Sequence, residues 1–189
     1  MAISDFPYTT WMLKDLAVHC DFVSLRYDVQ NGVGNVLGEC VHLLRYLGLK
    51  FKIIPGNTKW NRWNWREELW SSVKHLRPAV TLFPDHDEKF GAEWWDGEID
   101  TFIQCAAVKS LFTYEMATVD GRHVLPYPAA PHCKAFKWDS GISFQPYHGY
   151  AIPNYPGVDK FESCYSAASK MWHYCSFTKS MEANKQLHK

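Results

Sequence analysis

Residues 35–53 read NVLGECVHLLRYLGLKFKI and decide the fold class. Gly48 stands where helices commonly end in a left-handed residue, and the residues after it alternate at the spacing of a strand. The preceding apolar residues recur at helical spacing, at Val36, Leu37, Cys40, Val41, Leu44 and Leu47. This stretch therefore predicts a helix followed directly by a strand at residues 49–53.

A second helix and strand are predicted in residues 64–83, which read NWREELWSSVKHLRPAVTLF. Asn64 is the expected N-cap, with Glu67 three positions later, and Pro78 ends the helix. Its buried face is expected at Trp65, Leu69, Val73 and Leu76. Residues 79–83 then form a short buried strand. The order helix, strand, helix, strand with short joints predicts an α/β fold with a mostly parallel sheet flanked by helices.

The remaining segments give weaker signals. A first strand and an aromatic loop are expected within residues 2–12, an exposed strand at 22–29, a long strand at 108–116 and a short strand at 149–153. Asp120-Gly121 is the expected tip of a hairpin, and the three prolines of residues 125–131 exclude a helix or a central strand there. Apolar residues at helical spacing predict a last helix, with a face formed by Phe161, Cys164, Tyr165, Ala168, Met171, Trp172 and Cys175.

Composition excludes several classes of protein. The chain has 189 residues, which suits one α/β domain, and its 20 basic residues balance 20 acidic ones. No broad basic face therefore favours a nucleic acid as partner. The sequence contains no run of eighteen apolar residues, the length that a membrane-spanning helix needs. The first residues also do not have the pattern of a signal peptide, so we expect that a leader is missing from this sequence if the protein is extracellular. The nine tryptophans indicate either an aromatic-lined pocket or a core filled with large rings.

The residues that could carry chemistry do not form a recognisable set. Cys40 and His42 are a possible nucleophile and base, but residues two apart on a helix point to different sides. Asp85, His86 and Asp87 are adjacent, and adjacent residues rarely converge on one metal ion. The glycines of residues 32–34 lack the third glycine of a dinucleotide motif. We therefore expect no metal, no nucleotide cofactor and no catalytic pair. The six cysteines permit three disulfides without requiring them.

The charged loop at residues 84–89 follows the predicted strand 79–83 at its carboxyl end. Open α/β sheets keep their ligand-binding crevices at this end of the strands. A run of alternating charges is also typical of a solvated turn. Both interpretations of the loop are carried forward.

Several short motifs follow one another in a recognisable order. They are AISDFPY at 2–8, GECVHLLRYLGLKFKI at 38–53, WN and EL within 63–69, EIDTF at 98–102, LFTYEM at 111–116 and GYAIP at 149–153. In this order they resemble the glutamate-binding domain of ionotropic glutamate receptors and its relatives, the periplasmic solute-binding proteins.

The resemblance implies a divergent or truncated ligand-binding lobe of the periplasmic-binding-protein type. Residues 1–116 would form its first part, residues 149–177 its returning strand and helix, and residues 178–189 a polar tail. Residues 117–148 are expected to be an irregular, proline-rich insert in place of a second lobe, because they are fewer than the roughly 40 residues that an independent unit needs.

The resemblance also implies a site and a function. The site would be lined by Trp60, Pro84, His86, Lys89 and Tyr114. In the family, an arginine of the loop after the Pro84 position clamps the α-carboxylate of the ligand; here the loop has no arginine, and Lys89 is the expected substitute. The implied function is binding, without catalysis, of a small amino acid or another carboxylate by an extracellular or receptor-type domain.

Two alternative functions follow from the residues themselves. The first is an interaction module that uses exposed Trp94 and Trp95 as anchors for self-association or for a protein partner, because aromatic residues dominate interface hot spots. The second is a small hydrolase, which the lack of a nucleophile–base pair disfavours.

Overall fold

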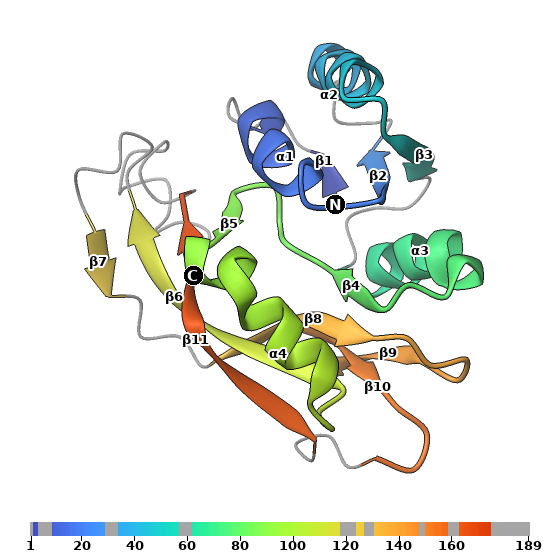
Figure 1. Cartoon of the computed structure of the whole chain (residues 1–189). Helices are drawn as coiled ribbons and strands as arrows, with labels where there is room; N and C mark the ends of the chain where they lie inside the picture. Colours follow the sequence, from blue (N-terminus) through green and yellow to red (C-terminus); the bar gives the residue numbers. More distant parts are fainter. Residues whose placement is uncertain are drawn as a thin grey trace, which may run out of the picture.

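A computed structural model describes residues 2–3, 9–28, 34–56, 62–117, 124–126, 131–147, 150–158 and 163–174. Within these ranges the protein is a mixed α/β fold with four α-helices and three β-sheets. Figure 1 shows a small sheet and two helices from the first part of the chain, and a larger sheet from the second part. No helix in the described ranges combines the length and the apolar composition needed to span a bilayer.

The small sheet is parallel. Its strands are β1 (Ala2–Ile3), β2 (Phe22–Asp28) and β3 (Lys50–Gly56), in that order across the sheet. Parallel neighbours need a crossover connection, which α1 (Thr9–Ala17) and α2 (Gly34–Tyr46) provide.

Strand β2 faces helices on both sides, because successive side chains of a strand point to opposite faces. Val23 and Leu25 lie in a buried cluster with residues of α1 and α2. Ser24 and Arg26 contact α3 (Arg62–Val73) instead, through the hydroxyl of Ser72 and the carboxylate of Glu68. The strand expected to be exposed is therefore the buried centre of a layered unit.

Both elements that residues 35–53 predict are confirmed. Helix α2 and strand β3 lie where residues 35–53 predict them, and Gly48 has the left-handed conformation, with φ of 68°. The aromatic loop expected up to Met12 is wrong at its end, because α1 begins at Thr9. Met12 and Leu13 are buried, and apolar residues follow them four positions later at Leu16 and Ala17. This spacing is typical of a helix and was present in the sequence.

Helix α3 also agrees with expectation, except at its ends. It begins at Arg62, so Asn64 lies inside the helix and is not its N-cap. A 3-10 turn at Lys74–Leu76 and the left-handed Arg77 complete it before Pro78. Leu76 is exposed, so the buried face ends earlier than predicted.

The larger sheet is mostly antiparallel. Among its described strands, only β6 (Lys109–Ala117) and β11 (Cys164–His173) are parallel neighbours. Its order is β4 (Val80–Leu82), β8 (His132–Lys137), β6, β11 and β5 (Glu88–Phe90), with β7 (Val124–Pro126) paired to β6. The expectation of a mostly parallel sheet is therefore correct for the small sheet and wrong for the larger one.

The second half of the chain departs most from expectation. The segment expected to be an irregular insert contains β7, β8 and β9 (Ser143–Tyr147). The strand expected at residues 149–153 is present as β10 (Tyr150–Asn154), but it pairs with β9 as a separate ribbon. The helix expected after it is strand β11, whose backbone pairs with both β5 and β6. Several expected features lie outside the described residues: residues 4–8 of the aromatic loop, the hairpin tip at Asp120-Gly121, Phe161, Cys175 and the tail at 178–189.

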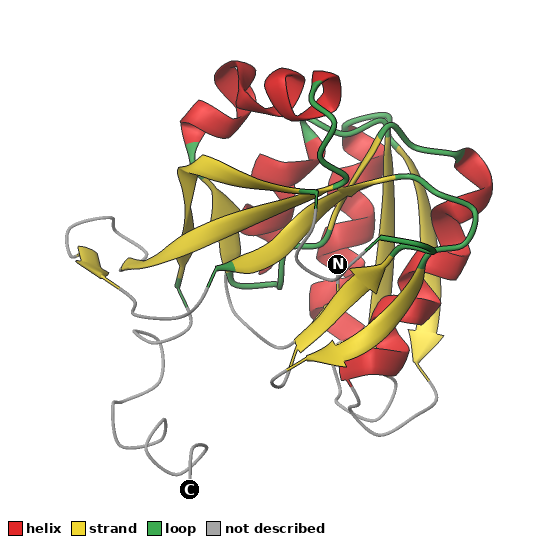
Figure 2. Ribbon diagram, turned by 90° about the horizontal axis from the view of Figure 1, so that it is seen from below, coloured by secondary structure: helices red, strands yellow, loops and turns green. Residues whose placement is uncertain are grey.

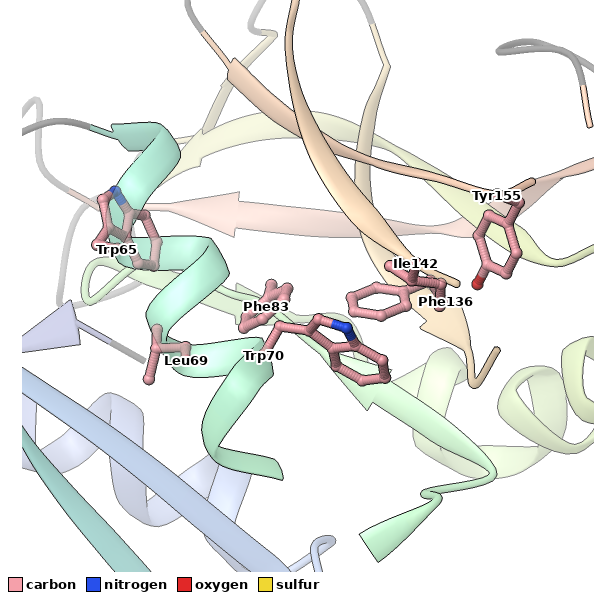
Figure 3. Close-up of a cluster of buried hydrophobic side chains, with 7 residues drawn as sticks. All are labelled: Trp65, Leu69, Trp70, Phe83, Phe136, Ile142 and Tyr155. Atoms are coloured by element: carbon pink, nitrogen blue, oxygen red, sulfur yellow. The ribbon is translucent and has the colours of Figure 1, made fainter. Parts of the chain in front are cut away.

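Two aromatic clusters hold these layers together. One joins α3 to the larger sheet and the β9–β10 ribbon (Figure 3), through Trp65, Leu69, Trp70, Phe83, Phe136, Ile142 and Tyr155. The other lies beneath α4 (Ile99–Gln104), which covers β6 and β11 in Figures 1 and 2, and includes Phe90, Trp94, Phe102, Phe112 and Met171.

The tryptophans proposed as surface anchors are not free. Trp94 is completely buried, and its ring packs edge-on against Phe112 with centroids 4.8 Å apart. Trp95 is half-buried and stacks on His19 at 4.1 Å. The hypothesis that exposed Trp94 and Trp95 anchor a partner is therefore wrong for Trp94, because its ring is buried.

Candidate functional site

Ionisable side chains converge at one end of the larger sheet, in a group that we call the ionic cluster. It consists of Arg66, Asp85, Asp87, Glu88, Tyr114, His132, Lys134 and His173. These residues come from α3, from the loop between β4 and β5, and from strands β5, β6, β8 and β11.

Strand direction explains why they meet. The parallel strands β6 and β11 end at the same edge of the sheet, where Tyr114 and His173 lie near their carboxyl ends. Strand β8 runs antiparallel to β6 and begins there, with His132 opposite Phe112. Strand β5 also begins there, with Glu88 opposite His173.

Lys134 is the centre of the cluster and is only 1% exposed. Its Nζ lies 2.8 Å from Oδ2 of Asp85 and 2.7 Å from Oε2 of Glu88. A second cation, Arg66, lies 3.7 Å from the other oxygen of Asp85. Two buried cations therefore share one carboxylate.

Arg66 is held by rings as well as by charge. Its guanidinium carbon lies 4.9 Å from the ring centroid of Trp65 and 5.6 Å from that of Phe83. Such stacking suits the planar guanidinium. The rings fix the orientation of Arg66 beside the loop that follows β4.

The loop itself is a tight turn closed by two hydrogen bonds. The backbone N–H of Asp85 donates to Oε2 of Glu88 at 2.7 Å, and the N–H of Glu88 donates to the carbonyl of Asp85 at 3.3 Å. Oδ2 of Asp87 lies 3.5 Å from Nε2 of His173 and 4.0 Å from that of His86. Asp87 and Glu88 are buried, so the interpretation of this loop as a solvated turn is wrong.

Burial and charge shift the pKa values of the two carboxyl groups that contact Lys134 in opposite directions. Burial raises the pKa of Glu88, and the nearby Lys134 only partly offsets this. Burial also acts on Asp85, but there the cations Lys134 and Arg66 outweigh it and hold the pKa below its ordinary range. Asp85 is therefore charged at neutral pH.

Two neighbours of these charges stay neutral. Burial, and then the carboxylates of Glu88 and Asp85, raise the pKa of Tyr114 well above its usual value. Burial, and then the Lys134 ammonium, lower the pKa of His132 to about 4. The cluster thus sets two neutral side chains beside fixed charges of both signs. Groups of perturbed pKa values of this kind gather at functional sites.

The residues expected in the site are only partly brought together. Tyr114 belongs to the ionic cluster, whereas Pro84 and His86 lie at its edge on the loop. Lys89 does not join them: its Nζ lies 2.8 Å from Asp15 and 5.2 Å from the ring centroid of Trp11, both on α1. Lys89 follows Glu88 in a strand, so its side chain points to the opposite face. Trp60 lies outside the described residues.

The sequence interpretation missed the two buried cations and both histidines of the cluster. Lys134 and Asp85 are 49 positions apart, so no local spacing connects them. Lys134 has one weak signal, its place within the otherwise apolar run from Cys133 to Phe136. A lysine in such a strand requires a buried partner.

The other candidate chemistry finds no support in the geometry. Cys40 is buried in α2 while His42 is exposed, and burial raises the pKa of Cys40 to about 11. The five cysteines of the described ranges are free thiols, and no three His, Cys, Asp or Glu side chains in those ranges are arranged to hold a metal ion. An open depression of about 430 Å³ lies between α1 and α2, away from the ionic cluster, and is lined by Thr10, Glu39, His42, Leu43 and Tyr46.

Comparison with known proteins adds no relative to this description. Neither the protein-family models nor the curated proteins contain a match to the chain, so the ionic cluster has to be interpreted from its own chemistry.

Proposed function

We propose that the protein binds a small carboxylate, such as an amino acid, at the ionic cluster. The observation that carries the proposal is the pair of buried cations, Lys134 and Arg66, held on either side of one carboxylate position. An arginine and a lysine of this kind recognise a carboxylate through charge-assisted hydrogen bonds.

The surroundings of the pair support the same class of ligand. Tyr114 and His132 are neutral groups that can donate or accept hydrogen bonds. The carboxylates of Asp87 and Glu88 can face the ammonium group of an amino acid. The one parallel pair of this sheet among the described strands, β6 and β11, ends here, and parallel α/β sheets bind their ligands at the carboxyl ends of the strands.

The finer proposal is a lobe like those of ionotropic glutamate receptors and periplasmic solute-binding proteins, acting as a binding module without catalysis. The motif order at residues 2–8, 38–53 and 98–102 supports it. In this proposal Arg66, which reaches the loop after Pro84 from α3, takes the place of the arginine that is missing from that loop. In this proposal Arg66 and Lys134 take the role first assigned to Lys89.

Calorimetry with a panel of amino acids and simple carboxylates tests the proposal. We expect at least one to bind the wild-type protein, and Arg66→Met to weaken that binding at least tenfold, since a charge-assisted hydrogen bond contributes about 1.5–3 kcal/mol. Arg66→Lys keeps the charge but loses the fork, so its affinity should lie in between.

Arg77→Met is the matched control. Arg77 is exposed and lies over the ring of Trp138, away from the ionic cluster, so its replacement should leave the affinity unchanged. A panel in which no compound changes either the heat or the melting temperature of the wild-type protein would contradict the proposed function.

A further inference from the structure

Asp85 differs from the groups that it contacts. Its side chain is 32% exposed, whereas those of Lys134, Arg66 and Glu88 are 1%, 5% and 4% exposed. Its two oxygens face the two cations separately, Oδ1 towards Arg66 and Oδ2 towards Lys134. Asp85 thus places a carboxylate between two buried cations while one side of it remains open to solvent.

Both cations keep other partners without Asp85. Lys134 also contacts Glu88 at 2.7 Å, and Arg66 stays between the rings of Trp65 and Phe83. Neither cation therefore has to move when the Asp85 carboxylate leaves. The position between them remains shaped for a carboxylate from another source.

The backbone of Asp85 is fixed independently of its side chain. Its N–H donates to Glu88, and its carbonyl accepts from the N–H of Glu88. Rotation about the first side-chain torsion of Asp85 can therefore turn the carboxylate towards solvent while the turn stays closed. Such rotamer changes are among the smallest movements that a protein makes.

We propose that Asp85 is an internal stand-in for the ligand, which occupies the carboxylate position in the free protein and is displaced when a ligand carboxylate binds. This inference rests on the proposed function. It makes the unliganded protein self-inhibited, because the apparent affinity falls by the fraction of molecules in which the position is vacant.

The test removes the internal carboxylate and supplies one from solution. Asp85→Ala is melted at pH 7 in sodium acetate and, at equal ionic strength, in sodium chloride. Acetate should raise the melting temperature of this variant by about 3–6 °C at ten times its Kd, and should raise the wild-type value by less, because Asp85 competes for the same position there. Equal melting temperatures of Asp85→Ala in the two salts overturn the inference.

Asp15→Ala is the matched control. The Asp15 side chain is similarly exposed, at 27%, and also pairs with a lysine at 2.8 Å. Lys89 is itself open to solvent, however, and no arginine of the described ranges shares the pair. Acetate should not stabilise this variant. An equal effect of acetate on both variants would show general salt action and overturn the inference.

A variant that does not fold still gives an answer. If Asp85→Ala is unfolded in chloride, refolding into acetate should recover its circular dichroism spectrum, and failure to recover it counts against the inference. Asp85→Asn provides a second measurement, because a neutral amide competes less well for the position between the two cations. The Asp85→Asn variant should bind a carboxylate found with the wild-type panel at least ten times more tightly than the wild-type protein does. If no compound of the panel binds the wild-type protein, the proposed function is contradicted. The acetate experiment on Asp85→Ala does not use the panel and tests the role of Asp85 separately.

Discussion

Lys134 is a buried cation at the centre of a strand and pairs with two carboxylates, Asp85 and Glu88. Glu88 is also buried. A buried ion costs several kcal/mol in lost hydration unless its partners compensate. Glu88 compensates Lys134 even when the Asp85 carboxylate is absent, and Glu88 in turn relies on Lys134 as its close cation.

We expect Lys134→Met to lower the free energy of unfolding by about 3–5 kcal/mol at pH 7, because Glu88 is then a buried charge without its cation. The loss should shrink on acidification. Without Lys134 the pKa of Glu88 rises further above its unfolded value, so the folded state binds a proton more tightly and gains stability as the pH falls. Urea denaturation at pH 7 and pH 5 measures both effects.

The control for this prediction is Lys89→Met. Lys89 and Asp15 are both more than a quarter exposed, and such surface pairs contribute at most about 1 kcal/mol. Similar losses for both lysine variants would contradict the central role of Lys134.

Sequence alone could locate part of this site and not the rest. Pro84 to Lys89 follow a strand that the local pattern predicts correctly, so the position of the loop was accessible. The partners that bury the loop were not, because Arg66 and Lys134 arrive from other elements through the tertiary fold. Without them, Asp85 to Glu88 have the composition of a solvated turn.

At the scale of elements, β11 shows how a local pattern can mislead. Its larger residues fall at helical spacing, whereas its inward positions are filled partly by the small Ala167 and Ser169, which give little hydrophobic alternation. The strand also advances from Ser166 to Lys170 while β6 advances only from Leu111 to Thr113. The sequence of β11 thus has features of both a strand and a helix, and its backbone pairing with β5 and β6 makes it a strand. Helix α2 had no such competitor, because its periodicity and Gly48 agree.

Glu98 holds this irregular part of β11 in place. Its carboxylate accepts the N–H of Ala168 at 2.5 Å, the N–H of Ser169 at 2.9 Å and the hydroxyl of Tyr165 at 3.1 Å. The Ser169 hydroxyl donates to it as well. Although burial opposes the charge, these hydrogen bonds lower the pKa of Glu98. One side chain thus replaces the ladder partner that the bulge removes.

We expect Glu98→Ala to destabilise the protein by about 1.5–3 kcal/mol, because the buried Ser169 loses a charged acceptor. Hydrogen exchange at the Ser169 amide should accelerate more than exchange at residues of β2. Asp100→Ala, at an exposed position in the first turn of α4, should cost less than about 1 kcal/mol. Unchanged exchange at Ser169 would remove Glu98 from this role.

At the scale of the whole molecule, the ionic cluster couples stability to pH. Burial, and then the Lys134 ammonium, lower the pKa of His132 from its ordinary value of 6.5 to about 4 in the folded protein. Between these values the unfolded chain binds a proton that the folded chain does not. The contribution of His132 to stability is therefore fully present above pH 6.5 and is lost as the pH falls through that window.

We expect an NMR titration of His132 to give a midpoint near 4. In His132→Gln, the decline in stability between pH 6.5 and pH 4 should be shallower than in the wild-type protein, because one proton-linked group has been removed. A midpoint close to the ordinary histidine value would contradict the burial of this imidazole beside Lys134.

Three consecutive residues of α3 reach three different parts of the molecule. Arg66 contacts the β4–β5 loop, Glu67 accepts the backbone N–H of Phe144 in β9, and Glu68 pairs with Arg26 in β2. The last two contacts span 77 and 42 positions of the chain. Contacts between such distant segments form late in folding, because the closure of long loops precedes them. We therefore expect substitutions at Glu67 and Glu68 to accelerate unfolding more than they slow folding, which stopped-flow kinetics in urea measures.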